Sequence, residues 1–442
     1  MSDHLTARAD AEREPSRGGA RRWSPWRTVV GFGLVSLTAD MVYEGARSVY
    51  GPLLASLGAS ALVVGLVTGA GEAMALLLRL VSGSLADRTR RYWPLTIAGY
   101  ALTAVCVPLL AVTPFLGSAG LTVAAGLILA ERIGKAVRSP AKSALLADAA
   151  GQIGMGRGLG VHKALDQIGA FAGPLLVAGL VAASAGALWP GLAALAVPGA
   201  VTMALLVATR RRAAEPAGPP AGPRSGSAAT PGTGQHRPDT ARVTAPGLPA
   251  PFLRFAVGSA LCTAGLVTFG LISFHLVERH LTPTAGVPVL YAAAMAAGAV
   301  AALVTGEAYD RLGPRTLLAL PFLVAAVPAL AFGGTLGVAA LGTLVWGVAV
   351  GVQDSTVKAL VADLVPRERR ATAFGIFAAV QGAGALVGGI ATGALYERSP
   401  TTLTAVVAAA QVVALLLIAA VRQPRPPARR PPARPDGPGR SP

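Results

Sequence analysis

Long apolar stretches alternate with short polar or glycine- and proline-rich connections along most of this chain. The apolar runs cover residues 28–55, 60–82, 94–113, 119–138, 158–182 and 188–209, and then 252–278, 286–309, 315–333, 337–361, 371–395 and 402–421. A helix needs about 20 apolar residues to cross a bilayer, whereas outer-membrane barrels show alternation over strands of about ten residues. Because the runs are long and lack alternation, the pattern predicts an all-α polytopic membrane protein with twelve transmembrane helices.

The spacing of these runs divides the chain into two halves with polar ends. We expect a basic N-terminal tail at 1–27, a six-helix bundle at 28–212, a linker at 213–250, a second six-helix bundle at 251–421 and a basic, proline-rich tail at 422–442. The linker is predicted to be disordered because Pro, Gly, Ala and Ser dominate it. The N-terminal tail contains six arginines and no apolar core, so it does not predict a cleavable signal peptide.

Composition excludes several classes of protein. Hydrophobic residues make up 53% of the 442 positions and charged residues only 13%. Soluble proteins carry about 25% charged residues, so neither a soluble enzyme nor an intrinsically disordered chain describes the whole sequence. The net charge of +17 could indicate nucleic acid, but the basic residues gather in the tails, the linker and the connections after even-numbered spans. This asymmetry predicts a multi-pass protein of the cell membrane with both termini cytoplasmic, and no nucleic-acid partner.

The two halves also resemble each other in sequence. Aligning positions 144–173 with positions 359–388 gives nine identities, one of which pairs Gly173 with Gly388. Aligning positions 83–92 with positions 306–315 matches the polar turns that follow spans 2 and 8. The two alignments have different offsets, so the loops between the aligned segments differ in length between the two halves. Weak internal symmetry of this kind is typical of transporters built from repeats, so we expect two similar bundles around a central pathway.

The turns after spans 2 and 8 carry the same charged motif. Its residues are Gly83, Asp87, Arg88 and Arg91 in the first turn, and Gly306, Asp310, Arg311, Gly313 and Arg315 in the second. Together with twelve spans and a long central loop, these turns resemble the motif G-x3-D-[RK]-x-G-x-[RK] of the major facilitator superfamily, whose fold is two six-helix bundles. The second copy matches throughout, whereas the first has Arg90 for the second glycine and Tyr92 for the last basic residue.

The resemblance implies that these turns latch one conformation of a transporter. In physical terms, Gly83 allows two helices to approach closely. Asp87 can cap a helix N-terminus and pair with a nearby arginine. The alternative is that both turns are ordinary charged cytoplasmic connections.

Span 5 contains a second motif, Gly169-x3-Gly173-Pro174, which resembles the antiporter motif of the same superfamily. Small residues four positions apart form a close-packing ridge, and Pro174 is expected to bend the helix. The resemblance therefore favours export by antiport. The alternative is a packing ridge that has no bearing on the direction of transport.

Charged residues inside the predicted spans provide the candidate chemistry. A charge at the centre of a transmembrane helix costs about 2.5–3.5 kcal/mol, so such residues usually face a cavity or a partner. Five of them lie on spans 1, 2 and 4, namely Asp40, Glu44, Arg47, Glu72 and Arg132. At about 1.5 Å per residue, all but Arg47 lie about 17–22 Å from the outer ends of their spans. Arg132 also stands at the place of the superfamily's span-4 arginine, which the resemblance implies faces span 1.

These five residues form a candidate proton-coupling cluster of three carboxylates and two arginines. One carboxylate then lacks a full counter-ion, and since burial favours its neutral form, it could carry a proton. We rank Asp40 first because Glu44 has Arg47 one turn away, and we rank Glu72 second. The alternative is a static salt-bridge cluster that holds spans 1, 2 and 4 together.

Other charged residues are predicted to form structural pairs. They are Lys135, Arg138, His162 and Asp166 in the first half, and Asp354 and Lys358 in the second. Asp166 is expected to pair with Lys135 or Arg138. Asp354 and Lys358 are four positions apart on span 10 and can satisfy each other. The second half is otherwise poor in such charges, which places the coupling chemistry mainly in the first bundle.

The sequence lacks motifs of enzymes and metal sites. It contains no H-E-x-x-H, G-x-S-x-G or G-x4-G-K-[ST], and its five histidines show no ligand spacing. We therefore expect no enzymatic activity, no cofactor and no metal.

The leading hypothesis is a monomeric secondary transporter that exports a small molecule by alternating access in exchange for protons. Proton-coupled uptake by symport is one alternative, and a non-transporting scaffold, a sensor or a channel on the same fold is another.

Overall fold

A computed structural model describes residues 23–213, 249–365 and 369–421 of the chain. Within these ranges the chain is almost entirely helical and contains no β-strand. Nearly all of the predicted linker and most of the two predicted tails lie outside the described residues.

The helices fall into two consecutive sets. The first set is α1 Pro25–Arg47, α2 Tyr50–Ser56, α3 Ala61–Thr89, α4 Tyr92–Leu109, α5 Gly120–Gly151, α6 Met155–Ala183, α7 Trp189–Ala194 and α8 Ala196–Arg212. The second set is α9 Ala250–Gly265, α10 Phe269–Glu278, α11 Gly286–Leu312, α12 Ala319–Ala331, α13 Leu336–Leu364, α14 Arg370–Arg398 and α15 Pro400–Ala419. Three predicted spans are each built from two pieces, which are α1 with α2, α7 with α8, and α9 with α10.

All twelve predicted apolar runs are therefore helical, and the predicted fold class is confirmed. Within the described residues, ten stretches are long and apolar enough to cross a membrane, and one of them, Gly286–Ala331, contains both α11 and α12. Helix α5 is not among the ten because it carries five charged residues between positions 131 and 142. Its charges are therefore the feature that separates it from an ordinary lipid-facing span.

Local sequence signals set several helix starts. The side chains of Ser24, Ser60, Thr268 and Ser399 each accept a hydrogen bond from a backbone N–H in the first turn of α1, α3, α10 and α15. Such N-caps satisfy one of the donors that a helix start leaves without a partner. Two of these caps precede a proline, which fits the first helical position because its missing N–H is not needed there.

Glycines bring equivalent helices together in the two bundles. Gly169 and Gly173 of α6 lie so close to α1 that an added Cβ would overlap its backbone carbonyl groups. The second bundle repeats this contact, with Gly384 and Gly388 of α14 against the backbone of α9. The alignment that pairs Gly173 with Gly388 also pairs Gly169 with Gly384, so the sequence repeat corresponds to a repeated helix contact.

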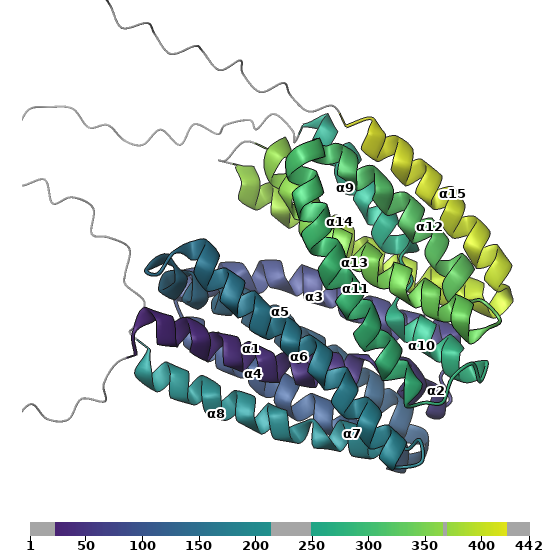
Figure 1. The fold of residues 1–442 in the computed structure, drawn as a ribbon, viewed down its shortest axis with the longest axis horizontal. Helices are drawn as coiled ribbons and strands as arrows, with labels where there is room; N and C mark the ends of the chain where they lie inside the picture. The colour runs from purple at the N-terminus through teal and green to yellow at the C-terminus, as the bar shows by residue number, and fades with distance from the viewer. Residues whose placement is uncertain (1–22, 214–248, 366–368, 422–442) are drawn as a thin grey trace, which may run out of the picture.

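The two bundles meet at one end and diverge at the other (Figure 1). At the closed end α2 lies against α10, and Gly51 contacts the α10 backbone directly. Hydrogen bonds cross this end from the Tyr291 hydroxyl to Glu44, and between the hydroxyls of Thr68 and Thr268 (2.8 Å). The open end is the one at which α1 and α9 begin and α8 and α15 finish (Figure 1).

Candidate functional site

A cavity of about 310 Å³ lies between the two bundles. Its polar and aromatic lining comes from Tyr43, Arg47, Glu72, Arg79, Arg132 and Lys135 of the first bundle, and from Thr263, Thr268, Trp346, Gln353, Asp354, Phe377 and Gln381 of the second. The first wall is rich in charge, whereas the second carries mostly neutral hydrogen-bonding and aromatic side chains. The cavity therefore lies where the sequence predicts a central pathway, with two chemically different walls.

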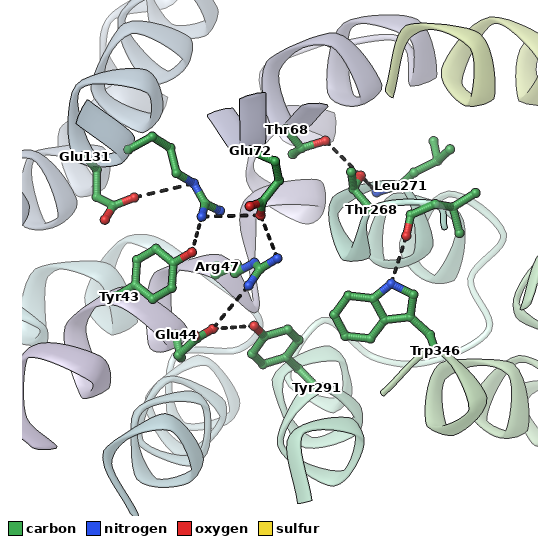
Figure 2. A network of polar contacts seen from close by, with 12 residues as sticks. Tyr43, Glu44, Arg47, Thr68, Glu72, Glu131, Thr268, Leu271, Tyr291 and Trp346 are labelled. Carbon is green, nitrogen blue, oxygen red and sulfur yellow. Dashed lines mark hydrogen bonds and ion pairs between the residues drawn. The ribbon is translucent and has the colours of Figure 1, made fainter. Parts of the chain in front are cut away.

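An acid–base network on α1, α3 and α5 forms the charged wall (Figure 2). Glu72 Oε1 lies 2.7 Å from Arg47 Nη2 and 3.4 Å from Arg132 Nη1, so one carboxylate joins two guanidinium groups. Arg47 Nη1 also lies 3.8 Å from Glu44 Oε2, which accepts a hydrogen bond from Tyr291 of the second bundle. The network thus extends from the cavity into the contact that closes one end of the molecule.

Arg132 connects this network to the buried side of α5. Its guanidinium donates to the Tyr43 hydroxyl, and its Nε lies 3.6 Å from Oε2 of Glu131. Glu131 is fully buried, and neither of its oxygens has a hydrogen-bond partner among the described residues. Lys135 Nζ lies 3.5 Å from the centre of the Tyr43 ring, which is a cation–π contact. Tyr43 therefore supports two cations of α5 at once.

The second wall contains a chain of neutral hydrogen bonds. Gln353 donates to the Thr263 hydroxyl, which donates to the side-chain carbonyl of Gln381. Gln381 Nε2 donates in turn to Ser259 Oγ at 2.6 Å. Trp346 Nε1 donates to the carbonyl of Val267 at 2.8 Å, which fixes the indole ring at the cavity (Figure 2). These side chains are held in place without any ion pair.

The structure brings together four of the five residues of the predicted coupling cluster, namely Glu44, Arg47, Glu72 and Arg132. Asp40 is separate from them, and the prediction that it shares their site is wrong. It lies on the part of α1 that contacts α6, where Gly169 and Gly173 touch the backbone of Leu37 and Met41. Counting residues gives only its level along α1, and the packing of α1 against α6 directs it to a different neighbour.

Asp40 instead forms a second polar cluster with α6. Its carboxyl group faces the carboxyl group of Asp166 at interaction distance. Ionised carboxylates can only accept hydrogen bonds, so a hydrogen bond between the two acids needs a proton on one of them. Asp166 Oδ2 also lies 2.7 Å from Nζ of Lys163, its neighbour one turn away. Two facing acids can share one proton, and Lys163 lies beside them.

The predicted partners of Asp166 are found elsewhere. Lys135 lies over the Tyr43 ring, and Arg138 is buried, donates to Thr103 and stacks 4.5 Å from the centre of the Tyr100 ring. The predicted pairing of Asp166 with either residue is wrong, because these two side chains of α5 meet aromatic rings of α1 and α4, whereas Asp166 meets an acid of α1.

His162 lies beside the acid pair. Its Nε2 is 3.4 Å from both Ser36 Oγ and Lys142 Nζ, and Lys142 donates to Ser36 at 3.0 Å. The cluster around Asp40 therefore contains two acids, two lysines and a histidine from α1, α5 and α6. Sequence reasoning named most of these residues, but it did not group them.

The first predicted latch turn is exposed and engages no residue of the second bundle within the described chain. Asp87 lies in the last turn of α3 and accepts a hydrogen bond from the Tyr92 hydroxyl at 3.5 Å, and it does not cap α4. A Cβ added at Gly83 would stand 3.7 Å from Pro140, an ordinary contact, so close approach does not require glycine there. Arg88 and Arg91 are exposed.

The second predicted latch turn has a different backbone conformation. Gly313 has φ +63° and ψ −148°, a region that is essentially open to glycine alone. Arg90, which aligns with it in the first turn, is left-handed helical with φ +54° and ψ +18°, which costs a residue with a side chain about 1–2 kcal/mol. Arg311 pairs with Glu307 on its own helix at 2.7 Å. Asp310 and Arg315 are exposed, and a Cβ added at Gly306 would stand 3.6 Å from Ser355 Oγ.

The span-5 motif has a packing role in the structure. Gly169 and Gly173 allow α6 to contact α1, and Pro174 lies inside α6 without interrupting the helix. The contact is repeated between α14 and α9, where the residue after Gly388 is Gly389 and not proline. The two glycines are therefore explained by helix packing.

The predicted pair on span 10 is not described in full. Asp354 lines the cavity at an exposed position on α13 and has an interaction partner, but the side chain of Lys358 lies outside the described part of the structure. Their pairing stays a prediction. Among the described residues, no group of three or more His, Cys, Asp or Glu side chains is placed to hold a metal ion.

Sequence reasoning missed most of the neutral wall. Thr263, Gln353 and Gln381 each interrupt an apolar run with a hydrogen-bonding group, which was the available signal. Tyr43 and Tyr291 gave no signal, because an aromatic residue inside an apolar run is most simply a core residue. Their hydroxyl groups became recognisable only when the structure placed them beside Arg132 and Glu44.

Comparison with known proteins gives relatives along nearly the whole chain. An uncharacterised protein of Mycobacterium tuberculosis is 49% identical over 412 residues, which cover 93% of this chain and 97% of the relative. A protein of Methanocaldococcus jannaschii described as an uncharacterised MFS-type transporter is 23% identical over 375 residues, covering 83% of this chain and 88% of the relative.

Solved structures share the fold at low sequence identity. A point mutant of the nucleoside transporter NupG aligns with a TM-score of 0.69 and 14% identity, covering 89% of this chain and 99% of that one. A bacterial homologue of the human lysosomal transporter Spinster, in an inward-facing and occupied conformation, aligns with a TM-score of 0.60 and 16% identity over 90% of this chain and 95% of that one.

The family comparison covers both bundles. The sequence profile described as Major Facilitator Superfamily matches residues 32–332 and 279–442. These matches agree with the twelve helical spans and with the cavity between two bundles, and they point to a membrane transporter and not to an enzyme. The chain belongs to the major facilitator superfamily.

Proposed function

We propose that this protein is a proton-coupled secondary transporter that moves a small molecule by alternating access, and that the Asp40–Asp166 pair is its proton-binding site. The observation that carries the proposal is the close approach of these two carboxyl groups on α1 and α6. A transporter coupled to protons needs an acid that can gain and lose a proton inside the membrane. Two acids that share one proton beside Lys163 and Lys142 provide such a group.

The internal repeat argues against a merely structural role for the acid pair. In the alignment of the two turns, Asp40 corresponds to Thr263. In the alignment that pairs Gly173 with Gly388, Asp166 corresponds to Gln381. Thr263 and Gln381 are also hydrogen-bonded to each other. The same helix contact is therefore made in the second bundle by a neutral pair, so packing alone does not require two acids at this place.

The shape of the molecule supports alternating access. The bundles are closed through α2 and α10 and diverge at the end where α1 begins and α15 finishes (Figure 1). Basic residues gather in the connections at that end, which favours a cytoplasmic location. With this orientation the structure is the inward-facing state, and the cell membrane is its expected location.

The direction of transport has two candidates. The span-5 motif favours export by antiport, but its glycines are explained by packing against α1. In antiport the proton and the substrate compete, whereas in symport each favours the binding of the other. Four basic residues and two acids line the cavity, and this excess of positive charge favours the second candidate, uptake with protons.

Transplanting the neutral pair tests the proposed coupling site. The protein is purified and reconstituted into liposomes that contain a pH-sensitive dye, and a panel of small molecules is screened for proton movement. In the double variant Asp40→Thr with Asp166→Gln, we expect a folded protein that still exchanges substrate but no longer accumulates it against its gradient. Proton-driven accumulation equal to that of the wild type would contradict the proposal.

A topology measurement tests the orientation. A protease site inserted at position 230, in the predicted linker, should be cut in inside-out vesicles and protected in intact cells. Cleavage from outside the cell would reverse the orientation and make this the outward-facing state.

A further inference from the structure

We infer that the cavity between the bundles binds a small organic anion, and that Lys135 contacts its negatively charged group. The inference rests on the proposed function and names the substrate class of the same site. The ionic lining is Arg47, Arg79, Arg132 and Lys135 against Glu72 and Asp354. The cavity wall is thus basic in excess, and a low-dielectric enclosure strengthens its attraction for an anion.

Acids compensate the two arginines of the first wall. Arg47 and Arg132 share Glu72 at 2.7 Å and 3.4 Å. They also lie near Glu44 and Glu131, respectively. Lys135 is half-buried over the Tyr43 ring and has no ion pair within 4.0 Å among the described residues. A half-buried ammonium without a carboxylate partner is the group that an incoming anion would satisfy, and the aromatic ring below it holds it in place.

Arg79 extends the positive surface along α3. It is exposed, and among the described residues it has no ion pair within 4.0 Å. It lies two turns of α3 from Glu72, in the direction of the last residue of that helix, so it stands between the network around Glu72 and the open end. An anion that enters from the open end would therefore meet Arg79 before Lys135.

The second wall fits the uncharged part of the ligand. Gln353, Gln381 and Thr263 offer amide and hydroxyl groups, and Trp346 and Phe377 offer aromatic surface. A cavity of about 310 Å³ is at the small end of the usual range for ligand pockets. The combination suits a compact molecule with one carboxylate or phosphate group and a flat or hydrogen-bonding body.

An anionic substrate also determines the sign of the coupling. Glu72 is held by Arg47 and Arg132, so the proton-binding group remains the Asp40–Asp166 pair of the proposed function. The charge of Lys135 acts on Asp40, so a proton on that pair leaves Lys135 with less compensation and favours an anion in the cavity. Protons and an anion then bind together, which is the relation that symport requires.

The test uses probes that share one skeleton and differ in charge. Benzoate, phenyl phosphate, benzamide and benzylammonium are titrated into the purified full-length protein in detergent, and the midpoint of thermal unfolding is measured. We expect saturable stabilisation by benzoate, by phenyl phosphate or by both, and none by benzylammonium, because binding to the folded state alone raises the midpoint. The relative response to the two anions identifies the preferred group.

Charge variants assign the contact. Lys135→Gln should weaken the response to the anion at least ten-fold, and Lys135→Arg should restore most of it. Arg254→Gln removes the same charge from an exposed position on α9 and should leave the response unchanged. An equal response to all probes, a response to benzylammonium alone, no response to any probe, or an unchanged anion response in Lys135→Gln would each overturn the inference.

The binding test and the transport test can fail separately. Charge-selective binding without any flux in liposomes would contradict the proposed function and leave the anion site standing. Proton-coupled flux of a cationic substrate would leave the proposed function standing and contradict the anion site.

Discussion

The two walls of the cavity come from halves that share one architecture, yet they differ in charge at equivalent positions. The two alignments of the repeat can be extended along the spans to the charged residues of the first wall. Arg47 then corresponds to Gly270, Glu72 to Met295 and Arg132 to Gly347. The second bundle packs its helices with small or apolar residues at places where the first bundle buries ions. Charge at these positions is therefore not needed to build a bundle.

This difference separates the requirements of the fold from those of function. Buried ion pairs are weak contributors to stability, and replacing them with well-packed apolar residues is often neutral or favourable. The first bundle nevertheless keeps an acid–base network at the cavity. Arg132 of this network donates a hydrogen bond to Tyr43, and Glu44 accepts one from Tyr291. We interpret the first wall as the part that senses charge and the second wall as the part that shapes the uncharged surface of the site.

The largest effect is expected from Arg132→Ala. This change leaves Glu131, which is fully buried, and Glu72 without the guanidinium between them, and breaking a buried pair in this way costs about 3–5 kcal/mol. We expect loss of both substrate exchange and proton-driven accumulation, together with lower abundance. Gln353→Ala, on the neutral wall, is the control and should retain abundance near that of the wild type. Normal flux per folded molecule in Arg132→Ala would remove the network from the mechanism.

The second effect distinguishes the acids of the first bundle from one another. Asp40→Asn makes the acid pair permanently neutral at one position, so exchange down the substrate gradient should survive while proton-driven accumulation falls at least ten-fold. Glu44→Gln removes a contact to Arg47 and Tyr291 and should reduce accumulation less. Both are measured as proton-coupled flux per folded molecule. Full coupling in Asp40→Asn, Glu44→Gln and Glu72→Gln alike would instead favour a static salt-bridge cluster.

A smaller effect is expected at the turns after α3 and α11. Asp87 and Asp310 are exposed in this state, so they contribute to it little, and we expect them to act in the opposite state. Asp87→Asn and Asp310→Asn should each lower flux several-fold at near-normal abundance, because they shift the conformational equilibrium and not the fold. Spin labels at Thr89 and Leu312 should report a larger share of the open state in both variants. Unchanged flux and unchanged label distances would mean that both turns are ordinary connections.

The smallest effect should come from the neutral wall. Gln353→Leu removes the donor to Thr263 at one end of the hydrogen-bond chain but leaves every ion pair of the first wall in place. We expect a few-fold rise in KM with the ratio of protons to substrate unchanged. Loss of proton coupling at an unchanged KM would contradict the interpretation that the first wall responds to charge and the second wall contacts the uncharged part of the substrate.

Much of this protein was determined by local sequence. The twelve helices follow from runs of apolar residues long enough to cross a bilayer, and the polar turns between them follow from glycine, proline and charge. The internal repeat was also visible, because Gly169 and Gly173 recur as Gly384 and Gly388 where two helices must approach at backbone distance. Counting residues along each helix predicts a common level for Glu44, Glu72 and Arg132, with Arg47 nearer the outer end.

The partner of each charge was decided by tertiary structure. Counting residues gives a position along a helix axis, but the neighbour of a side chain depends on which helix packs against that face. Asp40 shares a level with other charges of the first bundle, yet the glycine contact between α1 and α6 places it against Asp166. The neutral wall depended on packing even more strongly, because Thr263, Trp346 and Gln353 become one surface only when α9 and α13 lie side by side.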